Sequence, residues 1–194
     1  MRGLLLLVLL AGAAAVVVLM VRRASATRTP APPSPPGDPL RSDAGRSDPR
    51  RITVGDVVKY EARDFIVRGT LEFDQDGFRW QEHFLDDLEV RRWLSVEDDE
   101  GLEIVLWESL KGVDLQPGSR SLERDGITFT LEEHGRARFA ARGTTGTAPS
   151  GNVEYYDYAS GEDRLSFERY GEGPWEIGRG RVVSEYLLDI YPGS

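Results

Sequence analysis

Two clusters of histidine and carboxylate side chains are the residues of this chain best suited to metal-ion chemistry. His83 is followed closely by Asp86 and Asp87, and a second cluster is Glu132-Glu133-His134. Imidazole nitrogens and carboxylate oxygens are common ligands of zinc and other first-row metals. The chain has two histidines and no cysteine, which excludes a zinc site made of histidines alone. A mixed site that joins both clusters is the alternative, but we expect polar strand edges here and assign no metal ligand.

Other acidic and glycine-rich stretches lack the pattern that ion binding or catalysis requires. Asp74-Gln75-Asp76-Gly77 resembles the start of a calcium loop, but its glycine comes too early and the twelfth position is Leu85 instead of glutamate. Residues 97–100 are interpreted as an acidic turn, because nothing indicates a burial that would raise their pKa values. The loop at 143–151 has no lysine for phosphate binding. We predict no catalytic residue and no cofactor, with residues that meet only in the fold as the open alternative.

The stretch of residues 74–97 contains the elements that would position these side chains. Asp76-Gly77 favours a two-residue turn that needs positive φ, and alternating runs flank it. Before the turn, one face is expected to carry Phe65, Val67, Gly69, Leu71 and Phe73. After the turn, Phe78, Trp80, Glu82 and Phe84 share a face, opposite Arg79, Gln81 and His83. Runs at 90–97 and 102–107 complete a meander of four strands. Packing in a core is the expected role of Trp80, Trp93 and Trp107, with a ligand-stacking platform as the alternative.

Further short strands follow the meander. Asp125-Gly126 predicts another hairpin, and residues 184–191 fit either a helical turn or a last strand. The other expected strands are 136–142, 153–158, 164–170 and 175–183, with a loop at 143–151. Such spacing is typical of an all-β, mainly antiparallel sandwich or barrel.

An internal similarity suggests two related β modules. Residues 80–85 precede 92–97, and residues 153–158 precede 163–168. Both pairs join an aromatic strand to a strand that contains Leu-Ser-apolar-Glu. Chance similarity between hairpins is the alternative.

The same residues resemble a bacterial family called domain of unknown function 4178. The similarity rests on Val54-Gly-Asp-Val-Val-Lys-Tyr60, Phe65-Ile-Val-Arg-Gly69, Gly77-Phe-Arg-Trp-Gln-Glu82, Arg92-Trp-Leu-Ser-Val-Glu97, Tyr155-Tyr-Asp-Tyr158 and Leu165-Ser-Phe-Glu168. It covers about the whole of residues 52–194 and implies a β-rich domain with no established activity. Relatives in this family tend to be linked to membrane-associated bacterial proteins.

The N-terminal residues predict a membrane anchor and a tether. Leu4 to Val21 are 18 uncharged residues, which as a helix would span about 27 Å of a hydrocarbon core of about 30 Å. We therefore divide the chain into a transmembrane anchor (1–23), a Pro-rich disordered linker (24–51) and a β domain (52–194). The arginines after the apolar run outnumber Arg2 before it, which predicts a cytoplasmic domain. A cleaved signal peptide, and hence a secreted protein, is the alternative.

Charge narrows the class of partner. The first 51 residues hold eight Arg and three Asp, so residues 52–194 hold 16 basic and 30 acidic residues, a net charge of −14. Such a surface repels nucleic acid. We expect a membrane-anchored protein-binding or scaffold module, with a basic protein partner and Tyr155, Tyr156 and Tyr158 as contact anchors. The alternative is a metal- or small-molecule-dependent enzyme with a site between the two β modules.

Overall fold

The computed structural model describes residues 48–99 and 101–193. All eleven strands in this part of the chain are antiparallel and belong to one sheet. Two short 3-10 helices accompany them, η1 (Pro49–Arg51) and η2 (Glu185–Leu187). The strands are β1 (Val57–Tyr60), β2 (Arg63–Gln75), β3 (Phe78–Asp86), β4 (Arg91–Asp98), β5 (Leu102–Leu110), β6 (Ser121–Arg124), β7 (Ile127–Gly143), β8 (Ser150–Ser160), β9 (Asp163–Tyr170), β10 (Glu176–Val182) and β11 (Leu188–Tyr191). The all-β, antiparallel prediction is confirmed.

The predicted membrane anchor, residues 1–23, lies outside the described residues, as does most of the predicted linker. Within the described part, no helix is long and apolar enough to cross a membrane. The 3-10 helix η1 falls at the end of the stretch predicted as linker. There Pro49 is buried and Arg50 forms a salt bridge to Asp98 at 2.7 Å.

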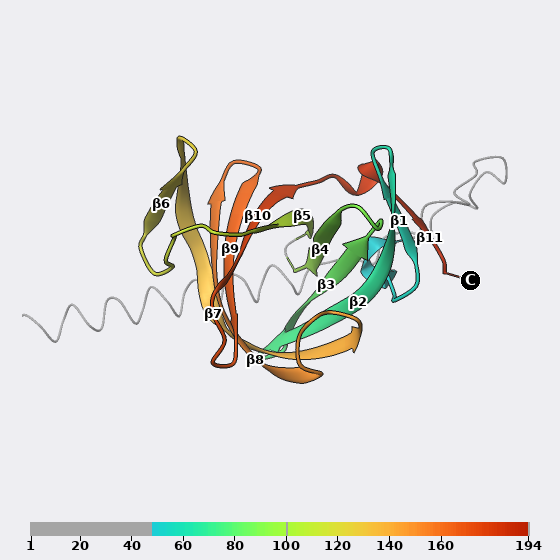
Figure 1. Cartoon of the computed structure of the whole chain (residues 1–194), viewed down its shortest axis with the longest axis horizontal. Coiled ribbons are helices and arrows are strands. Elements are labelled where there is room, and N and C mark those ends of the chain that lie inside the picture. The colour runs from blue at the N-terminus through green and yellow to red at the C-terminus, as the bar shows by residue number, and fades with distance from the viewer. Residues whose placement is uncertain (1–47, 100, 194) are drawn as a thin grey trace, which may run out of the picture. The chain divides into compact units, whose positions relative to one another are not determined.

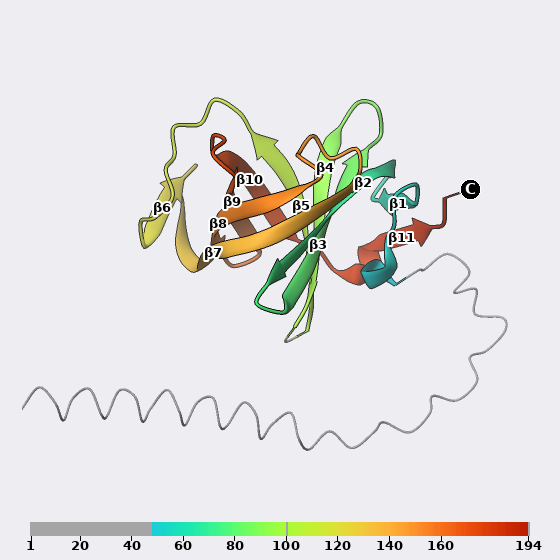
Figure 2. The same cartoon turned by 90° about the horizontal axis from the view of Figure 1, so that it is seen from below.

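Eight of the strands close into a barrel. The order along the sheet is β11-β1-β2-β3-β4-β5-β10-β9-β8-β7-β6, and a further pairing of β2 with β7 joins the two ends of the central eight. The short strands β1 with β11, and β6, continue the sheet beyond the barrel as separate flaps. Figures 1 and 2 show β6 and the β1–β11 pair at opposite sides of the barrel.

The long strand β2 changes both its neighbour and its inward face at a β-bulge. Its first residues pair with β1, and from Gly69 onwards it pairs with β7. The register with β3 shifts between Val67 and Gly69, which inserts Arg68 and reverses which side chains point inward. Phe65 and Val67 therefore pack outside the barrel, whereas Leu71 and Phe73 pack inside it. The prediction that all five alternating residues share one face is wrong for this reason.

The turn predictions are confirmed, and two later segments differ from expectation. Asp76 and Asp125 adopt φ values of 53° and 51° in the two Asp-Gly hairpins. Residues 127–143 form the single strand β7 instead of a hairpin arm and a separate strand at 136–142. The C-terminal segment contains both of its predicted alternatives, since η2 is followed directly by β11.

The apolar packing lies mainly on the outside of the barrel, in two separate cores. The first lies between β2–β5 and the β1–β11 flap, and the second between β7–β10 and the β6 hairpin with its preceding loop. The buried residues of the first core are Ile52, Val58, Phe65, Val67, Leu85, Leu94, Val96, Ile104, Val183, Leu188 and Ile190. Those of the second are Phe129, Tyr158, Leu165 and Phe167. A third, smaller cluster of Leu71, Phe73, Ala137, Phe139 and Val153 fills one part of the barrel interior.

Apart from β11, the barrel and its flaps are made of two halves with the same topology. Strands β1–β5 and β6–β10 each begin with a short hairpin, contain a bulge in the long second strand, and continue as a meander. Equivalent strands meet at both seams, where β2 pairs with β7 and β5 pairs with β10. Pairing of equivalent strands at both seams is expected if a pseudo-twofold axis crosses the barrel perpendicular to its long axis. The two halves agree with the two β modules suggested by the sequence.

Candidate functional site in the barrel lumen

Two adjoining cavities occupy the inner space of the barrel, which we call the lumen. Their volumes are about 210 Å³ and 540 Å³. The cavities share four wall residues, Glu82, Trp107, Ser166 and Glu168. These residues come from β3, β5 and β9, so the boundary between the cavities is formed by strands on opposite sides of the barrel.

The lumen is strongly acidic. Among the described residues, the only basic one in its wall is Arg164, which is paired with Glu103 at 3.0 Å. The carboxylates that line the two cavities are Glu82, Glu97, Asp99, Glu103, Glu108, Glu132, Glu133, Asp157, Glu168 and Glu176. Apart from Glu103 and Glu108, none of them forms a salt bridge within the described residues. The negative charge of the cavity wall is therefore largely uncompensated by protein cations.

Glu82 and Glu168 form a carboxyl pair at the boundary between the cavities. Burial raises the pKa of both side chains, and the proximity of Glu168 raises that of Glu82 further. The protonated Glu82 donates a hydrogen bond to Glu168, and the Tyr170 hydroxyl donates a second at 2.8 Å. Burial also raises the pKa of Tyr170, which keeps this phenol a donor. One shared proton therefore holds together two groups that would repel each other if both were ionised.

Burial raises the pKa of three further lumen carboxyls. That of Asp157 rises to about 7, despite a hydrogen bond from Ser166 that favours the charged form. Burial likewise raises the pKa of Glu97 and Glu176, and Glu103 adds to the effect at Glu97. The interpretation of residues 97–100 as an acidic turn is wrong for Glu97, because β4 extends to Asp98 and places this side chain in the lumen wall.

A polar network connects the wall of the larger cavity to its edge. The Tyr155 hydroxyl lies 2.7 Å from Glu133 and 2.6 Å from the Gln75 side-chain oxygen. Burial raises the pKa of this phenol, so it stays protonated. Glu133 is exposed at the edge of the cavity, whereas Tyr155 is buried. The network therefore fixes polar groups where the larger cavity meets solvent.

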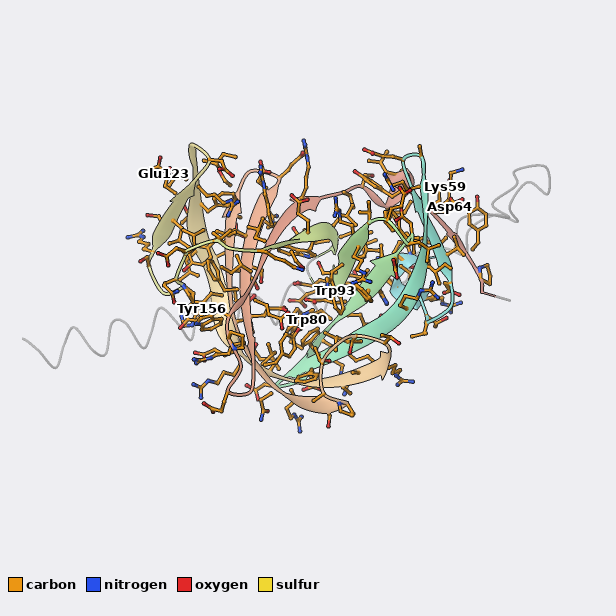
Figure 3. All side chains as sticks on the ribbon, in the orientation of Figure 1. Lys59, Asp64, Trp80, Trp93, Glu123 and Tyr156 are labelled. Atoms are coloured by element: carbon orange, nitrogen blue, oxygen red, sulfur yellow. The ribbon has the colours of Figure 1, made fainter. Side chains whose placement is uncertain are left out.

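Aromatic side chains form the remaining walls. Trp80 stacks on Phe73 with ring centroids 4.8 Å apart, and Trp93 packs against Phe84 at 5.1 Å. Figure 3 shows Trp80 and Trp93 in the middle of the barrel, in contrast to Asp64 and Glu123 on its outside. Both predicted roles of the tryptophans are compatible with this position, since the rings pack on neighbours and also face a cavity.

Trp107, which borders both cavities, is held in place from two sides. Its indole N–H donates to Ser95 at 2.9 Å. Its ring lies against β10 where two glycines leave room, and a Cβ on Gly180 would come within 2.5 Å of the ring, compared with 3.3 Å for Gly178. The ring between the cavities is therefore fixed by a hydrogen bond and by the absence of side chains opposite it.

The lumen contains two equivalent groups of residues, one from each half of the barrel. On the β3–β4 hairpin, Trp80 lies opposite Glu97 and Glu82 lies opposite Ser95. The β8–β9 hairpin repeats this arrangement, with Tyr155 opposite Glu168 and Asp157 opposite Ser166. All eight residues line the larger cavity. We call these groups half-site A (Trp80, Glu82, Ser95 and Glu97) and half-site B (Tyr155, Asp157, Ser166 and Glu168).

The two histidine and carboxylate clusters considered as metal sites are separated by the fold. His83 is fully buried outside the barrel, with its Nδ1 3.0 Å from the Thr70 hydroxyl. Burial lowers its pKa to about 4, so the ring is neutral. Asp86 and Asp87 accept backbone N–H bonds in the turn that follows, and Asp87 is paired with Arg63. Across the described residues, no three His, Asp or Glu side chains are arranged to hold a metal ion.

The side chains of the second cluster also lie apart from each other, and two of the three predicted tyrosine anchors are buried. Glu133 belongs to the lumen network, whereas His134 stacks on Tyr156 with ring centroids 5.3 Å apart. Tyr155 and Tyr158 are buried, so the prediction that they act as exposed contact anchors is wrong. The Tyr158 hydroxyl instead binds the loop before β6, through the Gly118 N–H and the Ser119 carbonyl.

Sequence reasoning missed the lumen as a site. Of its acidic residues, only Glu97, Asp99, Glu132 and Glu133 are considered as candidates from the sequence, and each is assigned to a turn or a strand edge. The internal similarity contained the missing information, because both of its Leu-Ser-apolar-Glu strands direct their Ser and Glu into the cavity.

Fold and site together define an eight-stranded antiparallel barrel domain with an acidic, aromatic lumen. The chain belongs to the family described as Domain of unknown function (DUF4178), which matches residues 53–185. It is 38% identical over 179 residues to uncharacterized proteins of Mycobacterium bovis and of two strains of Mycobacterium tuberculosis, covering 86% of each chain. No solved structure gives a significant match.

Proposed function

We propose that the domain is a binding module that takes up a small molecule in the barrel lumen. The observation that carries this proposal is the pair of adjoining cavities, whose acidic walls have almost no protein cation beside them. Burying carboxylates without cationic partners lowers the stability of a fold. Residues that lower stability and line a cavity are typical of a site kept for function.

The chemistry of the walls supports binding. The carboxyl pair Glu82–Glu168 accepts hydrogen bonds or cations, and the rings of Trp93 and Trp107 offer flat apolar surfaces. The outer cores stabilise the barrel without using the lumen, so the inner residues are available for a ligand.

The test is thermal unfolding of the full-length protein in detergent, followed by tryptophan fluorescence, against cationic, neutral and anionic small molecules. A ligand at one hundred times its Kd stabilises the folded state by about 2.7 kcal/mol, a rise in Tm on the order of 5 °C for a domain of this size. Ser95→Phe fills the larger cavity and should abolish the rise, whereas the exposed Glu123→Gln should leave it intact. Failure of every class to raise the Tm, or an equal rise in Ser95→Phe, would contradict the proposal.

We also propose that the barrel is held at the membrane on its cytoplasmic side. The support is the uncharged run Leu4 to Val21 and the arginines after it. Extraction with alkaline carbonate should leave the protein in the membrane pellet. A soluble protein, or a mature N-terminus at Thr27, would show a secreted protein instead. The chain has no cysteine, so Asp64→Cys labelled from outside intact cells would overturn the cytoplasmic orientation.

A basic protein partner remains a second proposal, supported by the net charge of −14 over residues 52–194. The same charge supports the prediction that nucleic acid is not a partner.

A further inference from the structure

The two half-sites of the larger cavity indicate what kind of molecule the lumen accepts. Each half-site offers two carboxyls, one serine hydroxyl and one aromatic ring, in the same cross-strand register. A cavity whose two walls repeat the same groups best fits a ligand whose two ends are alike.

The charge of the half-sites selects cationic ends. Four carboxyls, two from each half-site, face the larger cavity, whose one arginine is already paired with Glu103. A neutral polyol would bring no positive charge to the ionised carboxyls among these four, and an anion would be repelled. An ammonium group supplies three donors and a positive charge, which matches two carboxyls and a serine oxygen.

The aromatic residues favour a chain of methylenes between the two cationic ends. Trp80 and Tyr155, one from each half-site, lie next to each other with ring centroids 5.7 Å apart, edge to face. Their rings provide apolar surface for an alkyl linker and π faces for the ammonium groups.

We propose that the lumen binds a linear diamine, with one ammonium group in half-site A and the other in half-site B. This inference rests on the proposed function, because it names the ligand class of the same cavity. Glu82 of half-site A and Glu168 of half-site B share a proton when the lumen is empty. In the complex, each of these two carboxyls pairs with a different ammonium group. Ser95 and Ser166 orient the ends through their hydroxyl oxygens.

The test is isothermal titration of the full-length protein in detergent with three molecules of equal chain length: pentane-1,5-diamine, pentylamine and pentane-1,5-diol. The diamine should bind at least about tenfold more tightly than the monoamine, which is the effect of one additional charge-assisted hydrogen bond. The diol should bind more weakly than either amine. Pentylamine that binds as tightly as the diamine would overturn the two-ended arrangement.

Single variants of each half-site supply the second measurement. Glu82→Gln and Asp157→Asn keep the size of the side chain and should each lower diamine affinity at least about tenfold, toward that of pentylamine. Glu123→Gln, outside the barrel, should change nothing. Urea unfolding of each variant shows that it is folded.

The outcomes separate this inference from the proposed function. Diol binding as tight as diamine binding, abolished by Ser95→Phe, would overturn the cationic ligand and leave lumen binding intact. Equal diamine affinity in Glu82→Gln, Asp157→Asn and the parent would also overturn the inference. Absence of any lumen ligand, including in the thermal screen, would overturn both.

Discussion

Replacing Asp157 by asparagine should make the protein more stable at neutral pH and leave its stability unchanged in acid. The pKa of Asp157 rises from 3.8 to about 7 on folding. A carboxyl with a raised pKa in the folded state contributes full stability below its unfolded pKa and loses that contribution as the pH rises through the folded value. Between about pH 4 and pH 7 the parent protein therefore loses stability that Asp157→Asn retains.

The size of the effect follows from the shift. The rise in the pKa of Asp157 from 3.8 to about 7 corresponds to about 4 kcal/mol, at about 1.4 kcal/mol per pKa unit. Because Asp157 borders a cavity wide enough to hold water, we take about half of this, about 2 kcal/mol, as the expected gain above pH 7. Asparagine still offers a carbonyl oxygen to the Ser166 hydroxyl, so no buried donor loses its acceptor.

The assay is urea unfolding followed by tryptophan fluorescence at pH 4 and pH 7.5, with Asp64→Asn as the control at an exposed carboxyl. All four tryptophans lie between Trp80 and Trp175, so the signal reports on the barrel domain. A gain of the same size at both pH values would refute the reasoning from burial of charge. So would a loss of stability at pH 7.5, because it would show that the ionised carboxylate is favourable in the lumen.

Two further predictions concern other buried groups. Burial lowers the pKa of His83 from 6.5 to about 4, so the protein should lose up to about 3 kcal/mol as the pH falls from 6.5 to 4. His83→Gln should flatten this acid limb in urea titrations, and an unchanged limb would assign it to other groups. Gly180→Ala should destabilise the fold by about 1–3 kcal/mol, because its Cβ would come within 2.5 Å of Trp107 and 2.6 Å of Val105. Gly178→Ala, at 3.3 Å from the same ring, should cost clearly less, and equal losses in thermal unfolding would contradict the packing argument.

Local rules predicted the strands and turns, but the assignment of faces needed the three-dimensional structure. Asp76-Gly77 and Asp125-Gly126 marked their hairpins because a primed turn requires positive φ at its central residues. Alternation alone could not show that Arg68 forms a bulge, and one inserted residue reverses the inward face of everything after it.

The candidate site was hidden because both faces of the barrel wall are covered. The usual pattern places apolar residues inside and polar residues in solvent, yet here the outer Leu94 and Val96 are buried by the β1–β11 flap. Glu97 and Ser95 therefore look like solvent-facing residues in the sequence, although they line the lumen. Only the similarity between the two Leu-Ser-apolar-Glu strands set these positions apart.

The placement of the main cores outside the barrel separates the residues that pack these cores from those that would contact the proposed ligand. Substitutions at most positions of the lumen wall change charge and shape inside the cavities while the packing of β1–β11 and β6 against the wall stays intact. If the lumen binds a ligand as proposed, relatives could keep this architecture while their ligand preference diverges. On this proposal, agreement at the eight half-site positions would be a better guide to shared specificity between two relatives than their overall sequence identity.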